Sequence, residues 1–159
     1  MQKKYKGVKN QMRRYNKHTP PNNYLKYWRV IRYWATDKYG LSFTDLDMLF
    51  FLYAEGLFQK KDFREFNEVF SWEKGKFDRL MKEGWIIRWR TAQKGETALY
   101  EISFKGKRAV SAVYSKLNGD HISEHTPMFK SDSYMDKVQR NYIKKINLET
   151  RQARRHETE

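Results

Sequence analysis

The segment from Ser71 to Phe104 reads SWEKGKFDRLMKEGWIIRWRTAQKGETALYEISF. Its first part has the spacing i, i+3 and i+4 of one apolar helix stripe, formed by Phe77, Leu80 and Met81. A serine at the start is a residue type that caps helices, and Gly84 is the type that ends them. The pattern predicts a helix from Ser71 to about Glu83.

Two strand-like runs follow this helix. They are Trp85–Arg90 and Thr97–Ser103, and the polar tip between them contains Lys94 and Gly95. A helix, a glycine stop and a basic hairpin come in the order of a recognition helix and its wing. We therefore expect a mainly α fold with a small β-hairpin wing, that is, a winged helix-turn-helix.

Length and composition favour one globular domain with a real core. The chain has 159 residues, and 26 of them are aromatic, so disorder is not expected over most of it. The absence of cysteine excludes disulfides, thiol catalysis and thiolate zinc sites. No apolar run approaches 18 residues, so we expect no membrane span.

The net charge of +14 is unevenly distributed along the chain. Residues 1–36 carry ten Lys or Arg and no acid, whereas residues 37–85 carry eight bases and ten acids. Residues 86–116 have seven bases against two acids, and residues 130–155 have eight against three. Basic blocks around a neutral scaffold favour a polyanionic partner. The alternatives are solubility and attraction to an acidic protein.

Three segments are expected. Residues 1–21 form a basic flexible arm, in which Arg13 and Arg14 are candidates for minor-groove contact; the alternative is a solvated tail. Residues 22–119 form the winged-helix domain, and residues 120–159 form a loop and a C-terminal helix for dimerisation or partner contact.

Further helices are predicted on both sides of the expected recognition helix and wing. One covers residues 22–39, one follows a capping-box-like start at Ser42, and one covers about 61–70 with three phenylalanines inward. Ser103 is expected to cap another. The last starts at Asp132 or Ser133 and has an apolar stripe suited to pairing with another helix, formed by Met135, Val138, Tyr142 and Ile146.

The helix from Ser71 is expected to present cations outward. With Phe77 at the centre of the buried face, Arg79 points away and is the candidate for bidentate contact with guanine. Lys76 and Lys82 suit phosphates, and an exposed Gly75 suits close approach of a backbone. The alternative is an ordinary solvated face. The full set of candidate nucleic-acid-binding residues is Ser71, Trp72, Lys74, Gly75, Lys76, Arg79, Lys82, Arg88, Arg90, Lys94, Arg13 and Arg14.

No motif for catalysis or for a cofactor is present. Phosphate-binding glycine loops and nucleophile elbows are absent, so we expect no enzyme activity and no cofactor. His121 and His125 offer two imidazoles, with the carboxylate of Glu124 between them, but the run lies in a predicted loop with no further strong ligand nearby. No metal site is therefore expected. Aromatic residues such as Trp28, Trp34 and Tyr53 either line a ligand pocket or belong to the core.

About half the chain, Leu41 to Lys116, resembles the MarR-type winged helix of bacterial transcription regulators. The run LSFTDLDMLFFL resembles the family's helix that opens with Leu-Thr. The run FDRLMKEGWIIR resembles the family's junction between recognition helix and wing. The run ISFKGKR resembles the segment that leads the second wing strand into the next helix. The resemblance implies a twofold dimer built by terminal helices. The tip at Thr91–Glu96 departs from it, because the family's Asp-x-Arg is absent.

The sequence thus predicts a dimeric DNA-binding transcriptional regulator in the cytoplasm, associated with the nucleoid, or in host cytoplasm or a virion if the source is viral. Its partner would be double-stranded DNA. The alternative is a structural or adaptor protein, for example a virion component, that docks on protein or packaged nucleic acid. RNA binding is a weaker alternative, because no RNA-recognition motif is present.

Overall fold

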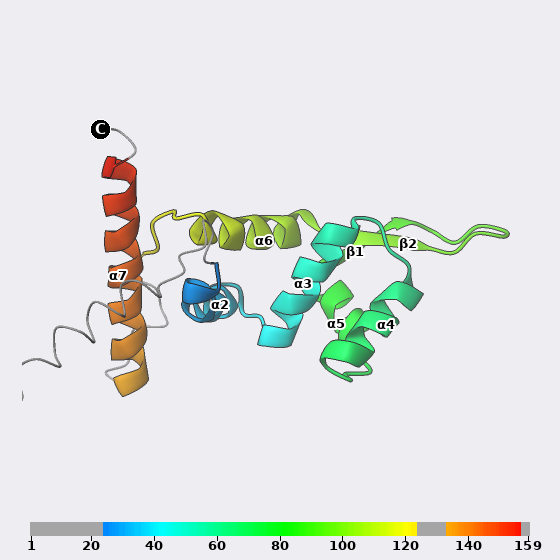
Figure 1. Cartoon of the computed structure of the whole chain (residues 1–159). Helices are drawn as coiled ribbons and strands as arrows, with labels where there is room; N and C mark the ends of the chain where they lie inside the picture. Colours follow the sequence, from blue (N-terminus) through cyan, green and yellow to red (C-terminus); the bar gives the residue numbers. More distant parts are fainter. Residues whose placement is uncertain (1–23, 124–132, 157–159) are drawn as a thin grey trace, which may run out of the picture.

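The computed structural model describes residues 24–123 and 133–156. This part of the chain is mainly helical with one two-stranded antiparallel sheet, as the sequence predicts (Figure 1). The predicted arm with Arg13 and Arg14, and the loop with Glu124 and His125, lie outside the described residues. The elements in order are α2 (Tyr24–Tyr39), α3 (Phe43–Glu55), α4 (Lys60–Phe70), α5 (Lys76–Lys82), β1 (Ile86–Arg90), β2 (Leu99–Ile102), α6 (Phe104–Leu117) and α7 (Tyr134–His156).

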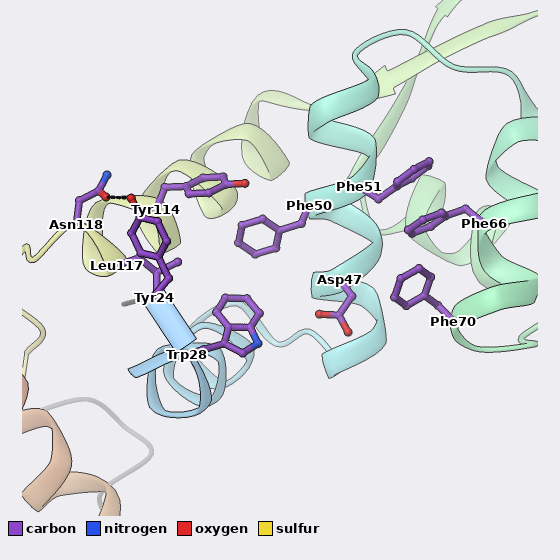
Figure 2. Close-up of a pocket in the computed structure, with 10 residues that line it drawn as sticks. All are labelled: Tyr24, Trp28, Asp47, Phe50, Phe51, Phe66, Phe70, Tyr114, Leu117 and Asn118. Atoms are coloured by element: carbon purple, nitrogen blue, oxygen red, sulfur yellow. Dashed lines mark hydrogen bonds between the residues drawn. The ribbon is translucent and has the colours of Figure 1, made fainter. Parts of the chain in front are cut away.

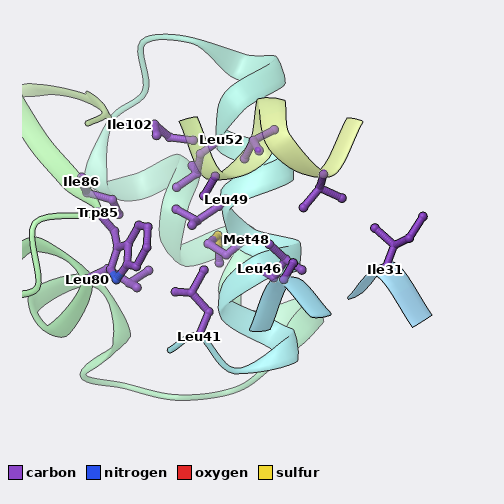
Figure 3. Packing of buried hydrophobic residues seen from close by; sticks show 14 of the residues in the cluster. Ile31, Leu41, Leu46, Met48, Leu49, Leu52, Leu80, Trp85, Ile86 and Ile102 are labelled. Atoms are coloured by element: carbon purple, nitrogen blue, oxygen red, sulfur yellow. The ribbon is translucent and has the colours of Figure 1, made fainter. Parts of the chain in front are cut away.

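Helix α3 is the centre of the core. The predicted capping box is present: the Ser42 hydroxyl accepts a hydrogen bond from the Asp45 amide, and the Asp45 carboxylate accepts one from the Ser42 amide. The helix packs against α2, α4, α6 and β2. The side chains at its centre are fully buried, and Figure 3 shows them meeting those of the hairpin; they are Leu46, Met48, Leu49 and Leu52.

Helices α2 and α6 pack against each other on one side of α3. As predicted, the Ser103 hydroxyl caps α6 by accepting a hydrogen bond from the Gly106 amide at 3.2 Å. Gly106 is required by close packing, because a Cβ there would lie 2.4 Å from Cγ2 of Ile102. Helix α6 is therefore held directly against the base of the hairpin.

The hairpin pairs Ile86 with Ile102 and Arg88 with Tyr100, and a bulge follows Arg88. Its predicted tip is present, with Gly95 at φ 86°. Tyr100 also forms an antiparallel bridge with Phe58, which precedes α4, through two backbone hydrogen bonds of 2.9 and 3.0 Å. The segment between α3 and α4 is thus paired with the outer edge of β2 through a single antiparallel bridge.

Helix α7 packs on α2. Ile143 and Ile146 are buried, and the Asn147 side chain exchanges two hydrogen bonds with the backbone of Ile122. Of the predicted stripe, Ile146 is used within the chain, whereas Met135 and Tyr142 are each about half exposed. Pairing of this stripe with another helix stays a prediction.

Candidate nucleic-acid interface

The predicted recognition helix is shorter than the sequence indicates. Helix α5 begins at Lys76, and Ser71 instead ends α4, where its amide donates to the Asn67 carbonyl. The amide of Trp72 donates to the same carbonyl, and the Asn67 side-chain amide donates to the Glu73 carbonyl. The prediction of a helix start at Ser71 was wrong because Asn67 organises residues 71–73 as a turn.

Trp72 is the most unusual residue of this turn. Its φ is 55°, in the left-handed region that bulky residues rarely adopt, and its side chain is 80% exposed. The hydrogen bonds of Asn67 on both sides of it hold this conformation. Gly75 is exposed, as the sequence predicts, and so are Lys74 and Lys82.

Lys76 points into the protein, contrary to the prediction. It is 0% exposed, and its Nζ lies 3.3 Å from Oδ1 of the buried Asp45 on α3. The ammonium also donates to the hydroxyl of Thr44 at 2.9 Å and to that of Ser71 at 3.0 Å. All three of its donor positions are thus engaged, and no phosphate can reach it.

Arg79 is also committed to an internal partner. Its two terminal nitrogens donate to the two oxygens of Asp45 at 2.8 and 3.1 Å. On the other side, Nε and one terminal nitrogen donate to the two carboxylate oxygens of Glu73, both at 3.0 Å. With both edges of the guanidinium occupied and its side chain only 35% exposed, Arg79 is not available for guanine in this arrangement.

The acidic members of this cluster are held in their charged form. Burial by itself raises the pKa of Asp45, but hydrogen bonds from Arg79 and Ser42, and the charge of Lys76, lower it below its ordinary value. The hydrogen bond from Arg79 lowers the pKa of Glu73 as well. The same contacts, first with Glu73 and then with Asp45, raise the pKa of Arg79. Ion pairs thus join four side chains into one group, which we call the α3–α5 ion cluster: Asp45, Glu73, Lys76 and Arg79. Glu83 adjoins this cluster through a 3.5 Å contact with Arg79.

The predicted single cationic surface on α5 is therefore wrong. Two of its cations are neutralised within the α3–α5 ion cluster, and the outward residues of α5 include acidic Asp78 as well as Lys82. The position of a residue around a helix does not fix where a long side chain such as that of Lys76 ends. The Lys76 side chain reaches inward because the buried carboxylate of Asp45 on α3 needs counter-charges.

The remaining predicted residues that the structure describes lie on the turn, at the end of α5 and on the hairpin. Arg90 pairs with Glu96 at 2.9 Å, and Ser71 is half-buried as an acceptor for Lys76. Four of the predicted cations are exposed, and within the described residues none of them forms an ion pair: Lys74, Lys82, Arg88 and Lys94.

The alternation of the first strand puts Ile87 and Trp89 on one face, and that face is exposed. Ile87 and Trp89 lie on the face away from the core, and both are about half exposed, although Trp85 before the strand is buried. Side chains alternate between the two faces of a strand, and Ile86 is buried in the core. Its neighbour Ile87 therefore points to the opposite face.

An aromatic groove of about 580 Å³ crosses the outer face of α3. Figure 2 shows the rings of Trp28, Phe50 and Tyr114 on one side and those of three phenylalanines on the other. Asp47 is the charged residue in its lining; burial raises the pKa of this carboxyl, which Arg32 contacts. Of the aromatics that the sequence assigned to pocket or core, Trp28 lines the groove and Trp34 is core. Phe70, predicted to be inward, lines this groove and is 40% exposed.

Within residues 24–123 and 133–156, no group of three metal-ligating side chains comes together. The helices described there are also too short or too polar to cross a bilayer. Comparisons with protein-family models, curated proteins and solved structures found no match to this chain.

Proposed function

We propose that the protein is a winged helix-turn-helix that binds duplex DNA, as a transcription regulator of the MarR type does. The observation that carries the proposal is the order and packing of α4, a five-residue turn, α5 and the hairpin. The bridge from Phe58 to Tyr100 supports it by placing a third strand position beside the hairpin. The three motifs of the resemblance fall at the start of α3, between α5 and β1, and between β2 and α6.

The contact that we propose is with phosphates, not with bases through Arg79. Lys74 lies on the turn, Lys82 near the end of α5, Arg88 on β1 and Lys94 at the tip. Their ammonium and guanidinium groups are exposed, so they can replace counterions on a duplex. The α3–α5 ion cluster contributes by fixing α5 on α3, which sets the position of the turn and hairpin. Sequence preference at the α5 surface is then expected to be weak.

The test is a salt titration of duplex binding by the wild type and by a variant with all four cations replaced by glutamine. Four phosphate contacts give a slope of log affinity against log salt of about −3.6, which is roughly a 150-fold loss between 50 and 200 mM. The variant is expected to reduce the magnitude of that slope by about 3–4. Fluorescence anisotropy with a labelled duplex measures both.

The matched control removes the same charge elsewhere: Arg29, Lys38, Lys61 and Arg64 on α2 and α4, which are exposed, become glutamine. Its slope is expected to stay close to that of the wild type. Equal reductions in both variants would show that affinity follows net charge alone, and would reject the proposed surface.

A second candidate function is protein docking, and one observation favours it. The end of α4 and the turn before α5 expose three apolar side chains, namely Val69, Phe70 and Trp72. An exposed tryptophan held in one conformation is a typical anchor of a protein interface. Absence of duplex binding at every salt concentration, with Trp72→Ser weakening a protein complex, would favour this function over the first.

A homodimer remains part of the proposal. The half-exposed Met135 and Tyr142 on α7 leave apolar surface that a second copy can cover. Sedimentation with and without a duplex distinguishes a closed dimer, with its two α5 helices about 34 Å apart on one DNA face, from a monomeric adaptor.

A further inference from the structure

The positive charge of the described residues lies mainly away from α5. Residues 71–103 carry seven bases and five acids, and Asp45 adds another acid to that region. Helix α6 carries four bases and no acid. Helix α7 carries seven bases, Lys137, Arg140, Lys144, Lys145, Arg151, Arg154 and Arg155, against two acids. The end of the molecule formed by α7 is therefore strongly basic.

The bases of α7 are not scattered around it. Four exposed ones follow each other at intervals of seven, seven and four residues, which places them within about 40° of one another on the helix surface. They span about 27 Å along the axis. We call this set the α7 basic row: Lys137, Lys144, Arg151 and Arg155.

Neither acid of α7 lies on this row. Asp136 is buried on the side that faces α2, and Glu149 is about 120° from Lys137 around the helix. Arg154 is off the row and contacts Asp120 at 3.4 Å. The acids of α7 therefore lie off the row, and Lys144 and Arg151 at its centre are exposed. A line of exposed bases along one helix is the footprint of a polyanion contact.

We infer that the α7 basic row binds the sugar–phosphate backbone of duplex nucleic acid, as a second contact separate from the hairpin. One strand of a duplex places a phosphate about every 3.4 Å along its axis, so a row of about 27 Å spans several phosphates. An anionic membrane fits less well. An interfacial helix must bury its apolar face in lipid, and on α7 Ile143 and Ile146 of that face are already buried within the protein.

The α7 basic row lies far from the hairpin. Figure 1 shows α7 at one end of the molecule and the hairpin tip at the other, with α2, α3 and α6 between them. One protein molecule therefore binds two duplex segments at once and bridges them. The bridging rests on the proposed function of the hairpin, whereas the α7 contact by itself does not.

The first experiment measures what the α7 basic row adds to duplex binding. The variant Lys144→Gln/Arg151→Gln removes the centre of the row, and Lys61→Gln/Arg64→Gln on α4 removes the same charge from another exposed helix. Anisotropy of a labelled 20-base-pair duplex across salt is expected to show the slope reduced by about 2 in the row variant, and by much less in the α4 variant. Unchanged far-ultraviolet circular dichroism confirms that α7 remains folded. An unchanged slope in the row variant would overturn the inference, even if the hairpin variant loses binding.

The second experiment measures bridging. Wild-type protein is expected to bring together two duplexes that carry a donor and an acceptor fluorophore. The row variant and the variant lacking Lys74, Lys82, Arg88 and Lys94 should each bind one duplex without energy transfer. Energy transfer that persists in the row variant would overturn bridging by α7. The same two variants are also tested on vesicles rich in phosphatidylserine. If the row variant loses binding to vesicles but not to the duplex, the partner of the row is a lipid surface, and the inference is overturned.

Discussion

Replacement of Asp45 by asparagine is expected to lower the free energy of unfolding by about 3–5 kcal/mol. Asparagine has nearly the same shape, so the change removes charge without creating a cavity. Lys76 would then be buried with its nearest remaining carboxylate, that of Glu73, 3.8 Å away. Because domains of this kind are stable by about 5–15 kcal/mol, the loss is a large share of the total. Urea unfolding followed by tryptophan fluorescence, to which the buried Trp34 and Trp85 contribute, measures it.

The matched control lies two residues along the same helix. Asp47 is half-buried and contacts Arg32, and burial already raises its pKa, so Asp47→Asn is expected to cost less than about 1 kcal/mol. Adding Lys76→Met to Asp45→Asn should recover part of the loss, since it removes the unpaired buried charge. Equal effects of Asp45→Asn and Asp47→Asn would contradict the assignment of Asp45 as the centre of the cluster.

Replacement of Arg79 by alanine is expected to separate stability from binding. The variant loses the hydrogen bonds to Asp45 and Glu73, and we expect about 1–3 kcal/mol of lost stability, limited by the partial exposure of the side chain. Its affinity for a duplex, per folded molecule, should stay within about twofold of the wild type, with unchanged preference among sequences.

Lys82→Ala is the counterpart of this variant on the same helix. Lys82 is exposed, so its replacement should change stability by less than about 0.5 kcal/mol and weaken duplex binding by about three- to tenfold. Unfolding curves and anisotropy titrations of the two variants give both quantities. Lost sequence preference in Arg79→Ala, at unchanged stability, would restore the guanine contact that the sequence predicts.

Much of the fold could be predicted from local sequence signals. The capping box at Ser42, the Ser103 cap and the glycine stops act over three or four residues, so they need no knowledge of the tertiary structure. The apolar spacing of the central helix predicts Leu46 and Leu49 in the core correctly, but Tyr53 of the same predicted stripe is 42% exposed.

The candidate site could be predicted less well, because its chemistry depends on contacts across the chain. Asp45 and Arg79 are 34 positions apart, and nothing local to Arg79 reveals that a buried carboxylate lies beside it. Lys76 is a similar case: a lysine next to the outer face of a predicted helix is normally solvated. The start of α5 was also misplaced, since Ser71 has the composition of an N-cap but ends the preceding helix through Asn67.

The most direct measurement of the buried cluster is the reactivity of individual lysines in the native protein. A brief treatment with an amine-acylating ester at neutral pH, followed by peptide mass spectrometry, compares Lys76 with its exposed neighbours Lys74 and Lys82. With the α3–α5 ion cluster closed, Lys76 reacts only when the structure opens, so we expect it to be modified at least about tenfold more slowly than either neighbour. Modification of Lys76 at the same rate as Lys74 and Lys82 would show that it faces solvent, and would contradict the account.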